Sequence, residues 1–145
     1  MENFKIDILK RDNIDIKYES LNNNQIIQVI KDIEFQYGNI FQNEKISFDI
    51  IRNKWLHEKI ELSSINEEDG FKNLCSLFKI ELKEKENVFV LWNEQNIDIF
   101  LMSDLYNFWD YIWYGPADEC CIIYFPNNIL FMINDYGIIY YIRCK

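Results

Sequence analysis

The sequence predicts an α+β fold, with N-terminal helices packed on a C-terminal antiparallel β-sheet that carries one inserted helix. Apolar residues recur at helical spacing through much of the chain before residue 80, whereas short apolar runs separated by turn sequences follow residue 86. A chain in which helices come first and consecutive strands follow is typical of α+β proteins. The 145 residues contain no linker rich in Pro, Gly or Ser, so we expect residues 1–145 to form one domain.

The N-terminal region is expected to form a hairpin and then a helix. Residues 4–18 alternate between apolar and polar side chains, which favours two β-strands joined by a turn at Asp12-Asn13. Isoleucines at helical spacing then predict a helix over residues 24–37. An Asn is available as its N-cap, and Gly38 ends it.

Two further helices are predicted before the sheet. The first covers residues 47–60 and would bury Phe48, Ile50, Ile51 and Trp55. A polar loop over residues 63–69 separates it from the second, which follows Gly70. The second would bury Phe71, Leu74, Cys75 and Phe78 along one side.

The C-terminal region is expected to form an antiparallel meander. Its strands are predicted over residues 88–92, 97–102, 120–125, 129–133 and 138–143, each pair separated by turn residues or by the inserted helix. The inserted helix begins with Ser103 as its cap and ends at Trp113, before Gly115-Pro116. Its inward stripe is Leu105, Phe108, Trp109 and Ile112.

Composition and charge exclude several classes of protein. The formal net charge is −9, which disfavours binding to a nucleic-acid backbone. No apolar run approaches the length of a membrane-spanning helix, so no membrane association is expected. The N-terminal residues are charged throughout and lack the apolar core of a secretory signal, so the expected location is cytoplasmic.

The sequence holds no motif that indicates catalysis or a cofactor. His57 is the single histidine, and Glu61 stands where a zinc-binding HExxH motif would have its second histidine. The four glycines are isolated from one another in the sequence, so they do not form the glycine-rich motif of a phosphate-binding loop. We therefore predict no catalytic residue, no metal site and no cofactor, and we expect the four cysteines to be reduced.

Acidic and aromatic residues are concentrated around the inserted helix. No Lys or Arg occurs between residues 87 and 142, a stretch that contains 15 of the 24 aromatic residues. On the predicted helix, Asp110 lies outside the inward stripe and has aromatic neighbours at helical spacing. An acid framed by Tyr and Trp outside the core is typical of a protein-binding hot spot. The predicted partner-binding residues are Tyr106, Asp110, Trp113, Tyr114, Asp118 and Glu119.

Charge indicates the kind of partner. A field of carboxylates attracts cations and repels nucleic acid, so the expected partner is a basic protein. Proteins that cut or bind nucleic acids are typically basic. A small acidic protein without an active site of its own suits the role of their inhibitor.

The stretch FWDYIWYGPADECCIIYFPNNILFMINDYGIIYYI, residues 108–142, resembles small acidic immunity proteins of bacterial polymorphic-toxin and contact-dependent inhibition systems. The shared features are size, acidity, an acidic-aromatic helix, an Asp-rich turn, a strand ending in Pro and a closing strand after Tyr-Gly. This resemblance implies an inhibitor that binds its cognate toxin domain tightly and blocks an active site or an entry channel. It implies no catalytic residue.

Two other functions remain open from the sequence. A small enzyme or ligand-binding domain would use an aromatic pocket lined by Trp92, Trp109 and Trp113 with one working carboxylate, Asp110 or Asp118. A self-associating module would use the terminal strand over residues 138–145 as an exposed sheet edge. The sequence does not fix the oligomeric state.

Overall fold

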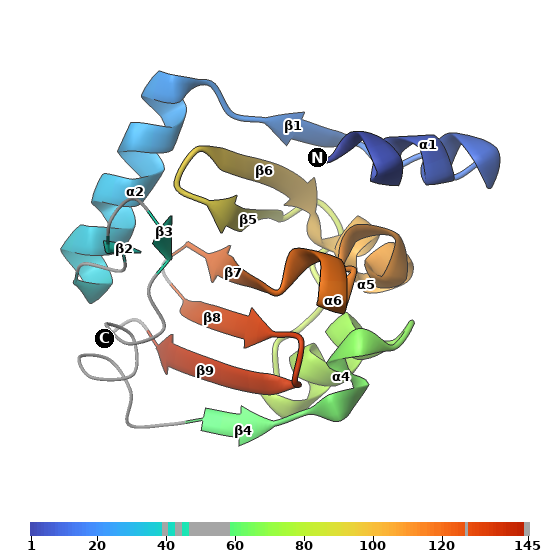
Figure 1. The fold of residues 1–145 in the computed structure, drawn as a ribbon. Coiled ribbons are helices and arrows are strands. Elements are labelled where there is room, and N and C mark those ends of the chain that lie inside the picture. Colours follow the sequence, from blue (N-terminus) through green and yellow to red (C-terminus); the bar gives the residue numbers. More distant parts are fainter. Residues whose placement is uncertain (39–40, 43–44, 47–58, 127, 144–145) are drawn as a thin grey trace.

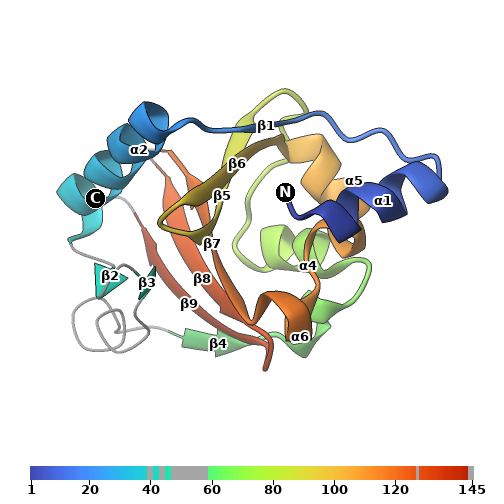
Figure 2. The same ribbon diagram turned by 45° about the horizontal axis from the view of Figure 1, so that its top comes forward.

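The computed structural model describes residues 1–38, 41–42, 45–46, 59–126 and 128–143. These residues form an antiparallel β-sheet that lies between helix α2 on one face and helices α1, α4, α5 and α6 on the other (Figures 1 and 2). The predicted α+β class, with helices early in the chain and consecutive strands late, is confirmed.

In the described part of the chain the main sheet has seven strands in the order β1-β6-β5-β7-β8-β9-β4. The predicted meander is confirmed, because β5 to β9 occupy the five predicted segments to within a few residues. A separate pair, β2 (Phe41–Gln42) with β3 (Lys45–Ile46), stands apart from this sheet. The strands of the main sheet are β1 (Tyr18–Ser20), β4 (Lys59–Glu61), β5 (Asn87–Asn93), β6 (Asn96–Leu101), β7 (Cys120–Phe125), β8 (Ile129–Asn134) and β9 (Ile138–Arg143).

Both faces of the sheet are apolar, which explains why its strands read as nearly continuous hydrophobic runs. One face packs against α4 and α5 and includes Ile123, Phe131 and Ile139. The other packs against α2 and includes Ile122 and Met132. Successive residues of one strand point to opposite faces, so each run supplies both cores.

Helices α2 (Asn23–Tyr37) and α4 (Gly70–Leu77) confirm two predictions. Helix α2 begins after Asn22, which forms a capping box with Gln25, and it ends at Gly38. Helix α4 follows the 3₁₀ turn η1 (Ser63–Asn66) and buries the predicted side, Phe71, Leu74, Cys75 and Phe78.

Predictions for three segments of the chain need correction. Residues Asn3–Arg11 form helix α1 instead of a strand, and its buried residues Lys5 and Leu9 lie one helical turn apart. The predicted helix over 47–60 lies mostly outside the described residues, but its end at Lys59-Ile60 belongs to strand β4. Since β4 pairs with β9, the terminal strand is not an edge, which removes the predicted basis for self-association.

The inserted helix is α5 (Met102–Ile112), followed by the short helix α6 (Gly115–Asp118). Helix α5 begins one residue before the predicted cap, with Leu101 at the N-cap and no side-chain cap. Phe108 has non-helical dihedral angles (φ −130°, ψ 31°), so the helix is kinked there. None of the helices in the described ranges combines the length and the apolar character that crossing a bilayer requires.

Candidate functional site

An open groove of about 590 Å³ lies where α6, the β8–β9 turn and strand β9 meet. Among the described residues, four that line it are apolar or aromatic, two are carboxylates and one is an amide. No Lys or Arg is among the described residues that line it. We call it the acidic groove; its lining residues are Pro116, Glu119, Asn134, Asp135, Tyr136, Ile138 and Tyr140.

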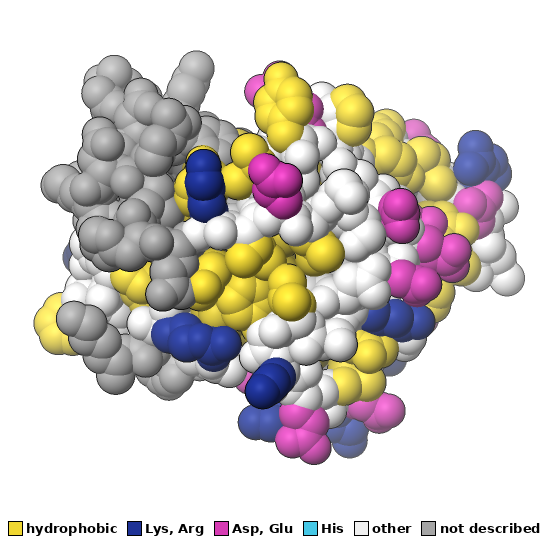
Figure 3. All heavy atoms as spheres, turned by 90° about the horizontal axis from the view of Figure 1, so that it is seen from below, with side chains coloured by type: hydrophobic (Ala, Val, Ile, Leu, Met, Phe, Trp, Pro, Cys, Tyr) yellow, Lys and Arg dark blue, Asp and Glu magenta, His cyan; other side chains and the backbone are white. Residues whose placement is uncertain are grey.

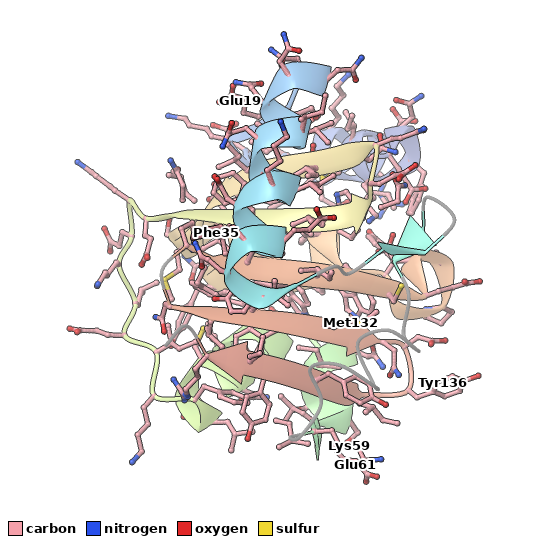
Figure 4. The ribbon with its side chains drawn as sticks, turned by 90° about the vertical axis from the view of Figure 1, so that its left-hand side faces the viewer. Glu19, Phe35, Lys59, Glu61, Met132 and Tyr136 are labelled. Atoms are coloured by element: carbon pink, nitrogen blue, oxygen red, sulfur yellow. The ribbon has the colours of Figure 1, made fainter. Side chains whose placement is uncertain are left out.

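The β8–β9 turn forms one wall of the acidic groove. Asn134 Oδ1 accepts hydrogen bonds from the backbone N–H groups of Tyr136 and Ile138, both at 3.0 Å. Gly137 then adopts φ +78°, and a Cβ atom there would lie 2.9 Å from Cα of Ser63. This tight turn projects Tyr136 away from the sheet with 83% of its surface exposed (Figure 4).

A hydrogen-bond relay from the helical layer holds the same turn. The indole Nε1 of Trp113 donates to Asn66 Oδ1 at 2.8 Å, and Asn66 Nδ2 donates to the backbone oxygen of Asp135 at 2.9 Å. Gly115 makes room for this amide, because a Cβ atom there would lie 2.6 Å from Asn66 Oδ1. Trp113 therefore positions Asp135 from inside the molecule.

The second wall of the acidic groove depends on a buried ion pair. Lys5 Nζ on α1 donates to both oxygens of Asp118, each at 2.8 Å, and neither side chain has more than 2% of its surface exposed. The backbone N–H of Tyr114 also donates to Asp118, at 2.7 Å. These contacts fix the end of α6, immediately before Glu119.

Glu119 joins the two walls. Its φ of +63° lies in a region that non-glycine residues rarely adopt. Its backbone oxygen accepts a hydrogen bond from the N–H of Asp135 at 2.9 Å. The two carboxylates that line the acidic groove thus belong to residues whose backbones are joined by a hydrogen bond.

The carboxylates act together on a neighbouring thiol. Burial and, after it, the charges of Glu119, Asp135 and Asp118 raise the pKa of Cys120 to about 11. Glu119 and Asp135 thus place negative charge beside this thiol, whereas the charge of Asp118 is compensated by Lys5.

More exposed acidic residues follow Asn66 in the chain. Glu67, Glu68 and Asp69 are exposed and directly follow Asn66, which bonds to the groove. Seen from the β4 edge, acidic side chains gather mainly toward the end of the molecule away from α2, beside a central hydrophobic patch (Figure 3). The β4 edge contributes one charge of each sign, Lys59 and Glu61 (Figure 4). These two residues pair across the strands with Tyr140 and Ile138, which line the acidic groove.

Two of the six predicted partner-binding residues are buried, so their assignment to an exposed face is corrected. Trp113 is 3% exposed, because it lies one helical turn after the buried Trp109 and stacks on it at 6.2 Å. The side chain of Asp118 is enclosed by its pairing with Lys5. Both residues support the acidic groove without being accessible to a partner.

The other four predicted residues reach the surface at different places. Glu119 is exposed and lines the acidic groove. Asp110 is exposed and lies near the half-buried Tyr114, whose pKa is raised by burial first and by Asp110 second. Tyr106 is half-buried beneath Lys72, whose Nζ lies 5.4 Å from its ring.

Sequence reasoning missed Asp135, Tyr136 and the sheet residues of the acidic groove. The sequence predicts turn residues between the strands over 129–133 and 138–143, and the structure has a turn there. What the sequence did not reveal is that this turn lies beside the end of α6, a contact between segments that pair only in the folded sheet.

The tryptophans of the alternative enzyme pocket are engaged in packing. Trp109 Nε1 donates to the backbone oxygen of Ile65 at 2.6 Å, and the ring of Trp92 lies 3.9 Å from Lys5 Nζ. Neither Asp110 nor Asp118 lines the acidic groove or the smaller pocket of about 200 Å³ beside Trp92. No group of three His, Cys, Asp or Glu residues suited to a metal ion occurs among the residues that the structure describes.

Comparison with known proteins found no matching family model, no matching curated protein and no matching solved structure.

Proposed function

We propose that this protein is an immunity-type inhibitor, which binds a basic protein domain in the cytoplasm and neutralises it. A cognate toxin domain that acts on nucleic acid is the expected partner, because such domains carry the positive charge that their substrate requires. The resemblance of residues 108–142 to small acidic immunity proteins agrees with this proposal.

The observation that carries the proposal is the acidic groove. Its lining combines Glu119 and Asp135 with an apolar floor and the exposed ring of Tyr136. Carboxylates beside exposed aromatic rings suit a protein partner, since the rings supply contact area and the charges steer the encounter.

The surrounding charge supports a basic partner over a neutral one. Glu67, Glu68 and Asp69 add exposed negative charge directly after Asn66, and the chain as a whole carries a net charge of −9. Such a field raises association rates for cationic partners by about 10- to 1000-fold at low salt. It also keeps the protein off nucleic acid.

The test is a binding measurement with the product of the neighbouring gene. We expect a stable complex and inhibition of that product's activity, with an association rate that falls as salt rises. The charge-removing variant Glu119→Gln/Asp135→Asn should associate about 3- to 10-fold more slowly.

A matched control removes the same number of charges elsewhere. Glu19 on β1 and Glu34 on α2 are exposed, and Glu19 lies at the opposite end of the molecule from Tyr136 (Figure 4). The variant Glu19→Gln/Glu34→Gln should associate at nearly the wild-type rate. Absence of any complex at low ionic strength, or equal effects of the two double variants, would contradict the proposal.

A further inference from the structure

We propose that the acidic groove is the binding pocket for a single arginine side chain of the basic partner. This inference rests on the proposed function and specifies how its contact is made. It follows from three features of the pocket: an apolar floor, two carboxylates and an aromatic rim.

The floor suits the methylene stem of a long cationic side chain. Ile138 and Tyr140 project from β9 toward the groove, and Pro116 closes the side formed by α6. Arginine buries its three methylenes on apolar surface while its charged group reaches polar partners. A compact cation such as a metal ion or ammonium would leave this floor without a contact.

The two carboxylates suit the guanidinium group. Glu119 and Asp135 reach the groove from two segments, and their backbones are joined by the 2.9 Å hydrogen bond from Asp135 N to Glu119 O. A guanidinium has five N–H donors in one plane, so it can serve two separate carboxylates at once. Placing one cation there also reduces the repulsion between the two acids.

The aromatic rim favours arginine over lysine. Tyr136 lines the groove with most of its ring exposed, so its face is accessible to an incoming group. The planar guanidinium stacks on aromatic rings and is more weakly hydrated than an ammonium group. Arginine therefore uses the floor, the acids and the ring together.

The experiment is an NMR titration of the ¹⁵N-labelled protein with N-acetyl-arginine methylamide, and with the lysine and citrulline analogues. We expect arginine to shift the amides of Glu119, Asp135, Tyr136 and Ile138, with a dissociation constant on the order of millimolar. Lysine should bind at least about 3-fold more weakly. Citrulline, which is neutral and nearly the same shape, should cause no saturable shift.

Variants identify the contacts. Glu119→Gln/Asp135→Asn should abolish the saturable shifts, and Tyr136→Leu should weaken arginine binding about 3-fold while preserving bulk. Glu19→Gln/Glu34→Gln should bind as the wild type does. An unchanged amide spectrum outside the groove confirms that each variant is folded.

The outcomes separate this inference from the proposed function. Equal binding of arginine and lysine, or shifts that lie elsewhere, overturns the arginine pocket, even if the toxin domain still forms a complex that depends on Glu119 and Asp135. Selective binding of arginine at the groove supports the pocket even where the neighbouring toxin domain forms no complex.

Discussion

Lys5 and Asp118 show how single buried residues determine the surface of this protein. Lys5 Nζ is enclosed by Asp118, by the ring of Trp92 at 3.9 Å and by the ring of Tyr114 at 5.8 Å. Asp118 in turn bonds the backbone of Tyr114. A pair enclosed in this way is costly to break, because removing one partner leaves a buried charge without compensation.

We therefore predict that Lys5→Met lowers the free energy of unfolding by about 3–5 kcal/mol. The double variant Lys5→Met/Asp118→Asn should regain most of this loss, since Asn still offers an oxygen to the Tyr114 N–H. Lys10→Met, an exposed position of α1, is the control and should change stability little. Urea unfolding measures all three; a Lys5→Met loss no larger than that of Lys10→Met would contradict the prediction.

At the scale of elements, prediction succeeded where a local pattern alone determines the structure. Helix α2 carries its own cap and stop, and β5 to β9 carry apolar runs with turn residues between them. Helix α1 was missed because its buried face contains Lys5, which does not register as apolar. The alternation of Phe4, Ile6 and Ile8 then resembled a strand.

The candidate site was predictable only in part, because some of its contacts depend on how distant segments pair. Glu119 is exposed and lines the acidic groove, and an acid before a strand and after a Gly-Pro turn is expected at the surface. Trp113, the residue that follows α5, is buried and not exposed as predicted, because it lies one turn after Trp109 and eight residues after Leu105. The contact of Asp135 with Glu119 arises from the pairing of β7 with β8, which no local pattern contains.

The β8–β9 turn provides a prediction about an element. Gly137 has φ +78°, and an added Cβ atom would lie 2.9 Å from Cα of Ser63 and 3.1 Å from the backbone oxygen of Leu62. Gly137→Ala should therefore destabilise the protein by about 1–3 kcal/mol and displace the turn. Tyr136→Ala, at the exposed neighbouring position, should not.

Thermal and urea unfolding of both variants measure the difference. Because the turn carries Asp135, Gly137→Ala should also weaken arginine binding while leaving the amide shifts of α2 unchanged. Equal stability of Gly137→Ala and the wild type would show that the turn can relax away from Ser63.

At the scale of the whole molecule, three buried or half-buried thiols among the described residues link stability to pH. Burial raises the pKa of Cys75 to about 12, and burial with nearby carboxylates raises that of Cys120 to about 11. Burial also raises the pKa of Cys121 well above its usual value. In the unfolded chain these thiols lose their protons near pH 8.5, so above that pH the native state binds more protons than the unfolded state.

We predict that the free energy of unfolding is constant up to about pH 8 and then falls by roughly 1–3 kcal/mol per pH unit between pH 9 and 10. The raised pKa values of Tyr111 and Tyr114 act in the same direction at higher pH. Urea unfolding at pH 7, 8, 9 and 10 in reducing buffer measures the slope. Stability that rises or stays level across this range would contradict the prediction.

The charge distribution of the whole molecule gives the last prediction, at the β4 edge. Lys59 pairs with Tyr140 across the strands, so it projects on the side of the sheet that carries the acidic groove. This cation opposes the entry of a basic partner, whereas Glu61 beside it favours entry. Lys59→Gln should therefore raise the association rate with the cognate domain about 2- to 5-fold at low salt, and Glu61→Gln should lower it. Both effects should vanish above about 0.5 M salt, where the Debye length is shorter than the distance between surface charges. Stopped-flow association at several salt concentrations distinguishes this long-range effect of charge from a direct contact with the partner. If Lys59→Gln instead weakens the complex equally at all salt concentrations, Lys59 touches the partner. The partner's surface at that point is then acidic.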